Sequence, residues 1–104
     1  MKKIRRIIIN NYVGKSIGAN YIVKMESLGG KIHFEENGLT FKSHALNIQK
    51  REIIISYNNI KSISNRNTLG IVPNGILVVT NDGEEHKFVI NNRNKVIEFL
   101  NSKV

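Results

Sequence analysis

Lys31-Ile-His-Phe-Glu-Glu-Asn-Gly-Leu-Thr-Phe-Lys-Ser43 is the stretch of sequence that points most directly to a fold. Apolar and polar residues alternate on both sides of Asn37-Gly38, as they do in strands with one buried face. The Asn-Gly pair favours a two-residue type I′ turn, because both positions accept a positive φ. The stretch therefore predicts a β-hairpin with Phe34 opposite Phe41.

The turn also assigns the side chains of the hairpin to its two faces. Successive side chains of a strand point to opposite sides of the sheet, so the pattern of alternation decides which residues are buried. We expect the core side to carry Ile32, Phe34, Leu39 and Phe41, and the wet side to carry His33, Glu35, Thr40 and Lys42.

Strand patterns continue before and after this hairpin. Residues 21–25 are expected to form a strand that ends at Gly29-Gly30, and further strands are expected at residues 52–57, 60–64, 76–80 and 86–90. The uninterrupted isoleucines in residues 52–57 predict burial on both sides of that strand for part of its length. Residues 65–74 are expected to be an irregular connection. Asp82-Gly83 favours a second two-residue turn, which would bury Leu77, Val79, Phe88 and Ile90 on one face.

The last part of the chain has the period of a helix. Within residues 93–103, and after Asn91 or Asn92 as the N-cap, the residues at core spacing are Val96, Ile97, Phe99 and Leu100. About seven antiparallel strands and one amphipathic helix predict a mainly β (α+β) fold, a partly open barrel capped by the C-terminal helix. Residues 1–19 are assigned to an N-terminal basic arm or extra element, and residues 20–104 to a single domain.

Five short motifs follow one another along residues 20–103. They are Gly29-Gly30-Lys31-Ile32, Gly38-Leu39-Thr40-Phe41-Lys42-Ser43-His44, Ile53-x-Ile55-x-Tyr57-x-x-Ile60-x-x-Ile63, Pro73-Asn74-Gly75-Ile76 and Asp82-Gly83-x-x-His86-x-Phe88. With these motifs in this order, the chain resembles the GRAM domain of the pleckstrin-homology-like (PH-like) superfamily, in its single-domain bacterial type. The resemblance implies a PH-like barrel without catalytic residues, whose ligand-binding end is built by the first, third and sixth inter-strand loops.

Composition narrows the classes to which this protein can belong. The chain has 104 residues, no cysteine and a formal net charge of +8, of which Lys2, Lys3, Arg5 and Arg6 carry four. Without cysteine there is no disulfide, thiolate nucleophile or cysteine-based zinc site, as in many proteins of the reducing cytosol, so we expect a cytoplasmic location. Residues 7–9 are too short an apolar run for a signal peptide, and no transmembrane segment is expected.

No group of residues in the sequence has the arrangement of an active site. His33 and His44 are expected on the outer face of the hairpin without a third ligand, so neither a metal nor another cofactor is expected. His86 shares a strand face with Phe88 and is expected to form a hydrogen bond at the edge of the core. No serine lies in a nucleophile elbow, and we therefore expect a protein that is not an enzyme.

The third loop is a candidate for binding, because Lys42, Lys50 and Arg51 make it basic. The sixth loop, residues 81–85, differs from it, since its carboxylates would oppose an anionic headgroup. The alternative interpretation of Lys50-Arg51 is an ordinary solvated loop.

An apolar segment after Arg66 is a second candidate, and its members are Leu69, Ile71 and Val72. If it is exposed, this tip could enter a membrane interface or a partner's groove while the basic arm attracts anionic lipid. The interpretation that the sequence favours is that the tip folds over the barrel and closes its second open end, because exposed apolar patches are uncommon.

Together these features predict a binding module that recruits a protein partner or docks peripherally to an anionic membrane, at the inner face of the cell membrane. The strand at residues 60–64 offers an edge to a partner strand or to a homodimer. The alternative function is nucleic-acid binding, which the positive net charge suggests. We consider it the weaker one because the phenylalanines fall at expected core positions instead of on an exposed stacking surface.

Overall fold

The computed structural model describes residues 11–44, 51–68 and 70–104. Within these ranges, seven strands, a 3-10 turn and one helix follow one another. The strands are β1 (Ser16–Val23), β2 (Glu26–Phe34), β3 (Gly38–Ser43), β4 (Glu52–Ser56), β5 (Ile60–Thr68), β6 (Val72–Thr80) and β7 (Glu85–Ile90). The 3-10 turn Tyr57–Asn59 joins β4 to β5, and α1 (Arg93–Lys103) follows β7.

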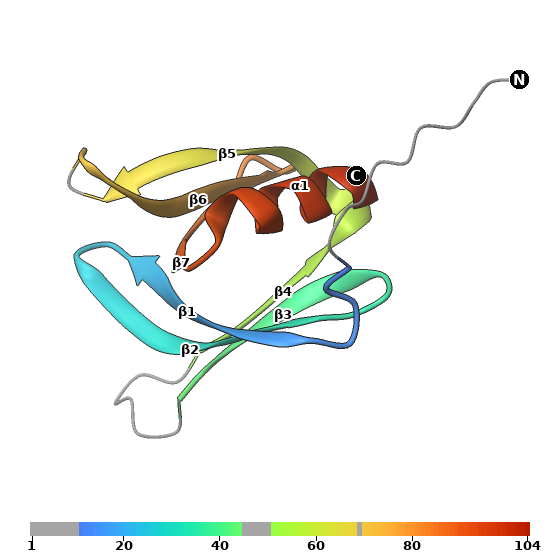
Figure 1. The fold of residues 1–104 in the computed structure, drawn as a ribbon, viewed down its shortest axis with the longest axis horizontal. Helices are drawn as coiled ribbons and strands as arrows, with labels where there is room; N and C mark the ends of the chain where they lie inside the picture. Colours follow the sequence, from blue (N-terminus) through green and yellow to red (C-terminus); the bar gives the residue numbers. More distant parts are fainter. Residues whose placement is uncertain (1–10, 45–50, 69) are drawn as a thin grey trace, which may run out of the picture.

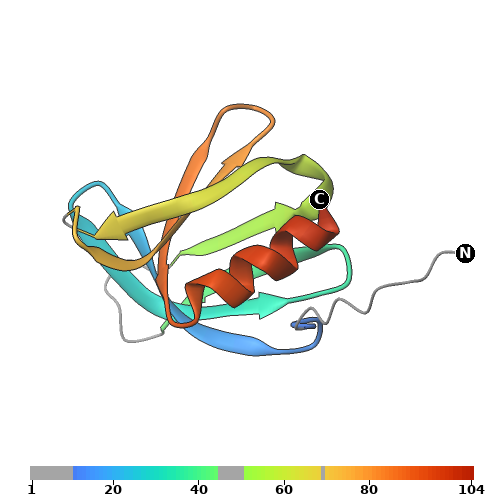
Figure 2. The same cartoon turned by 45° about the horizontal axis from the view of Figure 1, so that its top comes forward.

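The described strands form one antiparallel sheet in the order β4-β3-β2-β1-β7-β6-β5. The sheet curls so that β5 and β6 lie over the layer of β1, β2 and β3, with α1 at the open side between the two layers (Figure 1). Figure 2 shows the same helix lying along the mouth of the half-barrel. The predicted fold, a mainly β, partly open barrel of seven antiparallel strands with a C-terminal helix, is confirmed and is consistent with a PH-like fold.

The apolar face of α1 closes the half-barrel. Its buried residues are Val96, Phe99 and Leu100, as their spacing predicts. The ring of Phe99 lies edge-on to Phe34, with the ring centroids 5.5 Å apart. It makes edge contacts with Tyr12 at 5.5 Å and with Tyr57 at 6.2 Å as well. Edge-to-face pairs add stability beyond the area that they bury, so one helix side chain joins β2, the 3-10 turn and the segment before β1.

The β2–β3 hairpin has the predicted faces but not the predicted register. Its strands pair two residues away from the expected alignment, with Phe34 opposite Leu39. The turn consists of Glu36-Asn37 instead of Asn37-Gly38. Because side chains alternate with a period of two, a shift of two residues leaves each side chain on its predicted face. The apolar side of the hairpin is accordingly buried, with no side chain more than 1% exposed.

In the β6–β7 hairpin, by contrast, the difference in register changes which residues of β6 are buried. Its turn has three residues, 81–83, instead of two, and Gly83 adopts a φ of 90°. The extra residue shifts the register by one, and this moves the side chains to the other face of the sheet. The buried residues of β6 are therefore Ile76 and Val78 instead of Leu77 and Val79, whereas β7 buries the residues that were predicted.

The hairpin of β1 and β2 lies earlier in the chain than predicted. The two strands meet at the tight turn Lys24-Met25, so Gly29-Gly30 lies inside β2 and does not end a strand. β1 begins at Ser16, and it includes residues 16–19, which the sequence analysis placed in the N-terminal arm. The signal was misleading because the glycines serve a close approach between strands, while the turn carries no glycine, proline or asparagine.

β4 is an edge strand, so the predicted burial on both of its sides does not occur. Ile55 is buried, but Ile54 points outward and is 72% exposed.

β5 and β6 extend further than predicted and pair beyond the barrel as a two-stranded ribbon, so the expected irregular connection is mostly strand. Pro73 fits into β6 because it lies opposite the break in register between Arg66 and Thr68, where a strand tolerates proline.

Gly30 and Gly38 hold the curled sheet together by permitting close backbone contacts. A Cβ at Gly30 would lie 2.2 Å from the carbonyl oxygen of Lys42, and a Cβ at Gly38 would lie 2.5 Å from that of Ile55. We expect Gly30→Ala to lower the free energy of unfolding by ~1–3 kcal/mol in urea denaturation, as overpacking does. Gly18→Ala is the matched control, since nothing lies within 4 Å of the Cβ that it adds. Equal effects of the two substitutions would contradict this account.

Phe99→Ala tests how far the barrel depends on its helix. The substitution removes the ring at the centre of the aromatic cluster, and we expect a loss of ~3–5 kcal/mol in the free energy of unfolding. Glu98→Ala, at the exposed neighbouring position, should change that free energy by less than ~0.5 kcal/mol. Far-ultraviolet circular dichroism during urea denaturation measures both, and similar values would show that the barrel does not depend on this side chain.

Candidate functional site

The β1–β2 turn presents an exposed apolar side chain that the sequence analysis did not single out. Met25 is 98% exposed at the tip of the turn, next to Lys24, which adopts a φ of 55°. The prediction missed this tip because it placed both residues inside a strand. Only the pairing of Val23 with Glu26 shows that the chain reverses here.

Two cavities beside this turn are lined by three basic residues, Lys24, Lys42 and Arg51, and by two acidic residues, Glu26 and Glu52. One cavity of about 410 Å³ is lined by residues 23–26 and by Arg51, and another of about 360 Å³ is lined by Lys42, Ser43, Arg51 and Glu52. Arg51 belongs to both cavities, and its backbone N–H donates to the Ser43 hydroxyl at 2.7 Å. The structure thus brings Lys42 and Arg51 together, as the sequence analysis expected, and adds Lys24 to them.

The tip between β5 and β6 is exposed and does not close the barrel. Ile71 is 77% exposed and Val72 is 42% exposed, so the favoured interpretation that this segment folds over the barrel is wrong. The tip is held instead by its own turn, in which the N–H of Ile71 donates to the Thr68 carbonyl at 3.1 Å. Figures 1 and 2 both show this tip at the same end of the molecule as the β1–β2 turn.

Arg66 has a structural contact on β5 that the sequence did not reveal. Its carbonyl oxygen accepts a hydrogen bond from the guanidinium of Arg93 at 3.2 Å. The same Arg93 nitrogen donates to the Asn67 side chain at 3.0 Å and to the Gly75 carbonyl at 3.4 Å. Arg93 therefore joins the first residue of α1 to the base of the β5–β6 ribbon.

His86 makes the hydrogen bond that its strand position predicted. It is buried, and its Nδ1 lies 2.8 Å from the hydroxyl of Tyr21, while its Nε2 lies 3.5 Å from a carboxylate oxygen of Glu84. Burial raises the pKa of Tyr21, the nearby Arg51 lowers it and Glu84 raises it. Through His86, these contacts connect Tyr21 in the interior of the barrel with Glu84 beside the acidic β6–β7 turn.

The β6–β7 turn is acidic, as predicted, and it is internally ordered. The Thr80 hydroxyl donates to the Asp82 carboxylate, and the backbone N–H of Glu84 donates to the same carboxylate oxygen at 3.3 Å. These hydrogen bonds lower the pKa of Asp82, because they stabilise the charged carboxylate. The turn therefore keeps a fixed negative charge.

The histidines on the outer face of the hairpin do not form a cluster of ligands. His33 bonds through Nδ1 to the Ser16 hydroxyl at 2.6 Å, and the backbone N–H of His44 donates to the Gly29 carbonyl at 2.9 Å. In residues 11–44, 51–68 and 70–104, no three His, Cys, Asp or Glu side chains lie close enough together to hold a metal ion.

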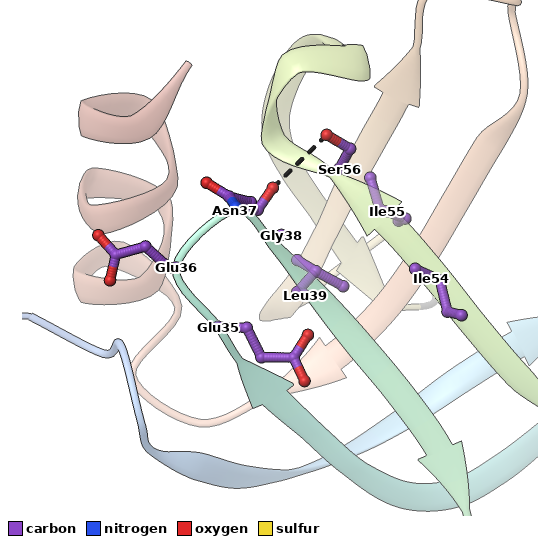
Figure 3. Close-up of a pocket in the computed structure, with 8 residues that line it drawn as sticks. All are labelled: Glu35, Glu36, Asn37, Gly38, Leu39, Ile54, Ile55 and Ser56. Carbon is purple, nitrogen blue, oxygen red and sulfur yellow. Dashed lines mark hydrogen bonds between the residues drawn. The ribbon is translucent and has the colours of Figure 1, made fainter.

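A cavity of about 400 Å³ lies between the β2–β3 turn and the edge strand β4 (Figure 3). Residues 35–39 and 54–56 line it, and the Ser56 hydroxyl donates to the Asn37 carbonyl across it at 3.5 Å. Leu39, Ile54 and Ile55 give it an apolar wall, and Glu35 and Glu36 also line it. In Figure 3 the side chain of Glu36 points away from that of Glu35 and from the apolar wall. No local pattern in the sequence predicts this cavity, because it depends on which residues form the turn and on the outward face of β4.

Several predicted binding residues lie outside the described parts of the chain. They are Lys2, Lys3, Arg5, Arg6, Lys50 and Leu69. In the parts that are described, no helix is long and apolar enough to cross a membrane.

Comparison with known proteins shows the fold and no more. The sequence matches no protein-family model and no curated protein. It is similar to a solved structure, the C-terminal domain of an unknown protein from Leishmania infantum, with a TM-score of 0.74 and 20% sequence identity. The similarity covers 88% of this chain and 82% of that chain. A mainly β half-barrel with one C-terminal helix is therefore an architecture that this chain shares with a known structure.

The environment of Tyr57 gives this end of the molecule a pH dependence. Burial, together with the nearby carboxylates of Glu35 and Glu36, raises the pKa of Tyr57 from 10.0 to about 12. Because the folded state holds the phenolic proton more tightly, the associated stability is complete below pH 10.0 and is lost as the pH rises toward 12. We expect the free energy of unfolding to fall across this window in chemical denaturation.

Tyr57→Phe removes this titration. At neutral pH the variant should lose ~1 kcal/mol, because the Tyr57 hydroxyl donates to the Glu35 carbonyl at 2.9 Å. Above pH 10.0 its stability should fall less steeply than that of the native protein. Parallel pH profiles for the two proteins would show that Tyr57 does not titrate in this window.

Proposed function

We propose that this protein is a non-catalytic binding module of the GRAM type within the PH-like superfamily, and that it docks peripherally to anionic membranes at the cytoplasmic face. The observation that carries the proposal is the exposure of Met25 and Ile71 on two hairpin tips at one end of the molecule. Fold and motif order support membership of this superfamily.

The exposed side chains suit a membrane interface. Met25, Ile71 and Val72 are separate from the core, and each would leave water on entering the boundary between headgroups and acyl chains. Transfer of one such side chain contributes ~1.5–3 kcal/mol when burial is complete. Two tips that insert together would also set the orientation of the domain on the surface.

The charges beside the β1–β2 tip suit an anionic surface. Lys24, Lys42 and Arg51 are exposed there, and each contributes ~1 kcal/mol near an anionic leaflet. The same region carries negative charge, since Glu26 lines one of these cavities and Glu52 the other. The mixed charge favours attraction to the general surface potential over a deep pocket for one multiply charged headgroup.

Nucleic-acid binding is the weaker alternative. The four phenylalanines, Phe34, Phe41, Phe88 and Phe99, are at most 2% exposed and so give no stacking surface for bases.

Co-sedimentation with neutral and anionic vesicles tests the proposal. We expect binding to anionic vesicles, and we expect Met25→Asp and Ile71→Asp each to weaken it by ~10-fold or more, because each removes one inserting side chain. Val104→Asp is the matched control, since it adds the same charge at an exposed apolar position at the C-terminal end, away from both tips.

A second pair of variants tests the basic residues. Lys24→Gln with Arg51→Gln should weaken binding to anionic vesicles more than Lys61→Gln with Lys95→Gln, although both pairs remove two positive charges. Failure of the native protein to bind, or equal effects of the tip variants and Val104→Asp, would overturn membrane docking.

A further inference from the structure

The sheet of the described chain has two edge strands, β4 and β5, and they differ in regularity. The pairing of β5 with β6 shifts register near Ile60 and again near Arg66. Irregularities of this kind twist an edge strand and hinder further pairing. The pairing of β4 with β3 runs without a shift from Glu52 to Ser56. Of the two edges, β4 is therefore the one that can accept another strand.

The ladder between β3 and β4 shows which backbone groups of β4 face the free side. The N–H of Ser43 donates to the Arg51 carbonyl at 3.0 Å, and the N–H of Tyr57 donates to the Asn37 carbonyl at 3.0 Å. Bonded and non-bonded pairs alternate in an antiparallel ladder, so residues 53 and 55 also direct their backbone groups toward β3. The even-numbered residues of β4 direct theirs toward the side where the described chain has no strand.

These even-numbered residues, Glu52, Ile54 and Ser56, are arranged symmetrically about Ile54. In an antiparallel pair of two copies with the two-fold axis at Ile54, Ile54 lies opposite Ile54 and Glu52 lies opposite Ser56. Residues whose backbone groups point outward therefore meet each other, and no like charges stand directly opposite. The two Ile54 side chains, each 72% exposed in the single chain, meet on one face. The edge of β4 is thus complementary to itself.

The charges at the two ends of β4 also favour a second copy. Lys42, Arg51 and Glu52 line a cavity at the start of the strand and leave a net positive charge there. Glu35 and Glu36 line the cavity at its end, and no lysine, arginine or histidine lines that cavity. Antiparallel pairing brings the basic start of one copy toward the acidic end of the other, which favours association.

We propose that β4 pairs with β4 of a second copy of this chain, antiparallel and centred on Ile54, to form a homodimer with a two-fold axis. A second copy is favoured over an unstructured peptide because its strand is already formed, so pairing does not have to order a flexible chain. β4 has only five residues. Such a pairing buries less than the ~1,200 Å² of a standard interface, so the dimer forms at high protein concentration.

Sedimentation equilibrium of the full chain without lipid tests the proposal, and its outcome is independent of membrane docking. Between about 10 μM and about 1 mM we expect an equilibrium of monomer and dimer. Ile54→Lys should raise the dissociation constant ~10-fold or more, because the two-fold axis places the two added charges directly opposite each other. Ile71→Lys is the matched control, since it makes the same change at an isoleucine that is 77% exposed on the β5–β6 tip.

Cysteine cross-linking tests the register, because the chain has no cysteine of its own. Under mild oxidation Ile54→Cys should form a covalent dimer faster than Ile71→Cys, although Ile71 is the more exposed residue. Opposed residues of a bonded pair lie ~5.5 Å apart, which suits a disulfide. Glu52→Cys should cross-link with Ser56→Cys in a mixture but not with itself, since the two copies of residue 52 lie ~14 Å apart along the strands.

Three results would overturn the proposal. The first is a native protein that stays monomeric up to about 1 mM. The second is a dimer that survives Ile54→Lys, or that Ile71→Lys weakens as much. The third is cross-linking of Glu52→Cys with itself as fast as with Ser56→Cys.

Discussion

The insertion of α1 into the mouth of the curled sheet is the constraint on which the rest of the structure depends. A seven-stranded sheet that curls without closing leaves an apolar inner face open to water on one side. Phe99 and its neighbours cover that face and bring Phe34, Tyr12 and Tyr57 into one aromatic cluster. Curling is possible in turn because Gly30 and Gly38 let adjacent backbones approach more closely than any side chain would permit. The glycines therefore allow the sheet to curl, and the helix covers the apolar face that the curled sheet leaves open.

Closing the barrel in this way gives the molecule two chemically different ends. The aromatic cluster, the start of the described chain and the acidic cavity lie at one end, and the exposed tips of two hairpins lie at the other. Lys24, Glu26 and Arg51 lie beside Met25, whereas Glu35 and Glu36 lie at the opposite turn. A surface field organised in this manner orients a protein before contact, because charges act at longer range than packing does.

The sequence predicted the architecture better than the register, and the reason is specific. Alternation identified the buried face of the β2–β3 hairpin even though its turn is Glu36-Asn37, because a shift of two residues preserves the faces. At the β6–β7 turn a single additional residue shifts the register by one. Val78 is therefore buried in the core, where Val79 was predicted.

The exposure of individual side chains was harder to predict than the order and type of the secondary-structure elements. Whether Ile54 or Ile71 is covered depends on which strand lies at the sheet edge and how far a hairpin projects, and neither property is encoded locally. The cavity between the β2–β3 turn and β4 could not be predicted from the sequence for the same reason, since it requires β4 to lie beside that turn.

The β5–β6 ribbon has a mechanical consequence. β6 pairs with β7 only from Gly75 to Val79, so among the described residues the part of the ribbon beyond Gly75 pairs with no other strand of the sheet, and two-stranded hairpins are marginal when alone. Its base is fixed by Arg93, which bonds to Arg66, Asn67 and Gly75 from the first residue of α1. The ribbon can therefore open locally without unfolding the barrel, while a force that tilts it as a whole acts on the guanidinium and through it on the helix. A movement of the projecting hairpin as a rigid unit would therefore reach the start of α1 through the hydrogen bonds of Arg93.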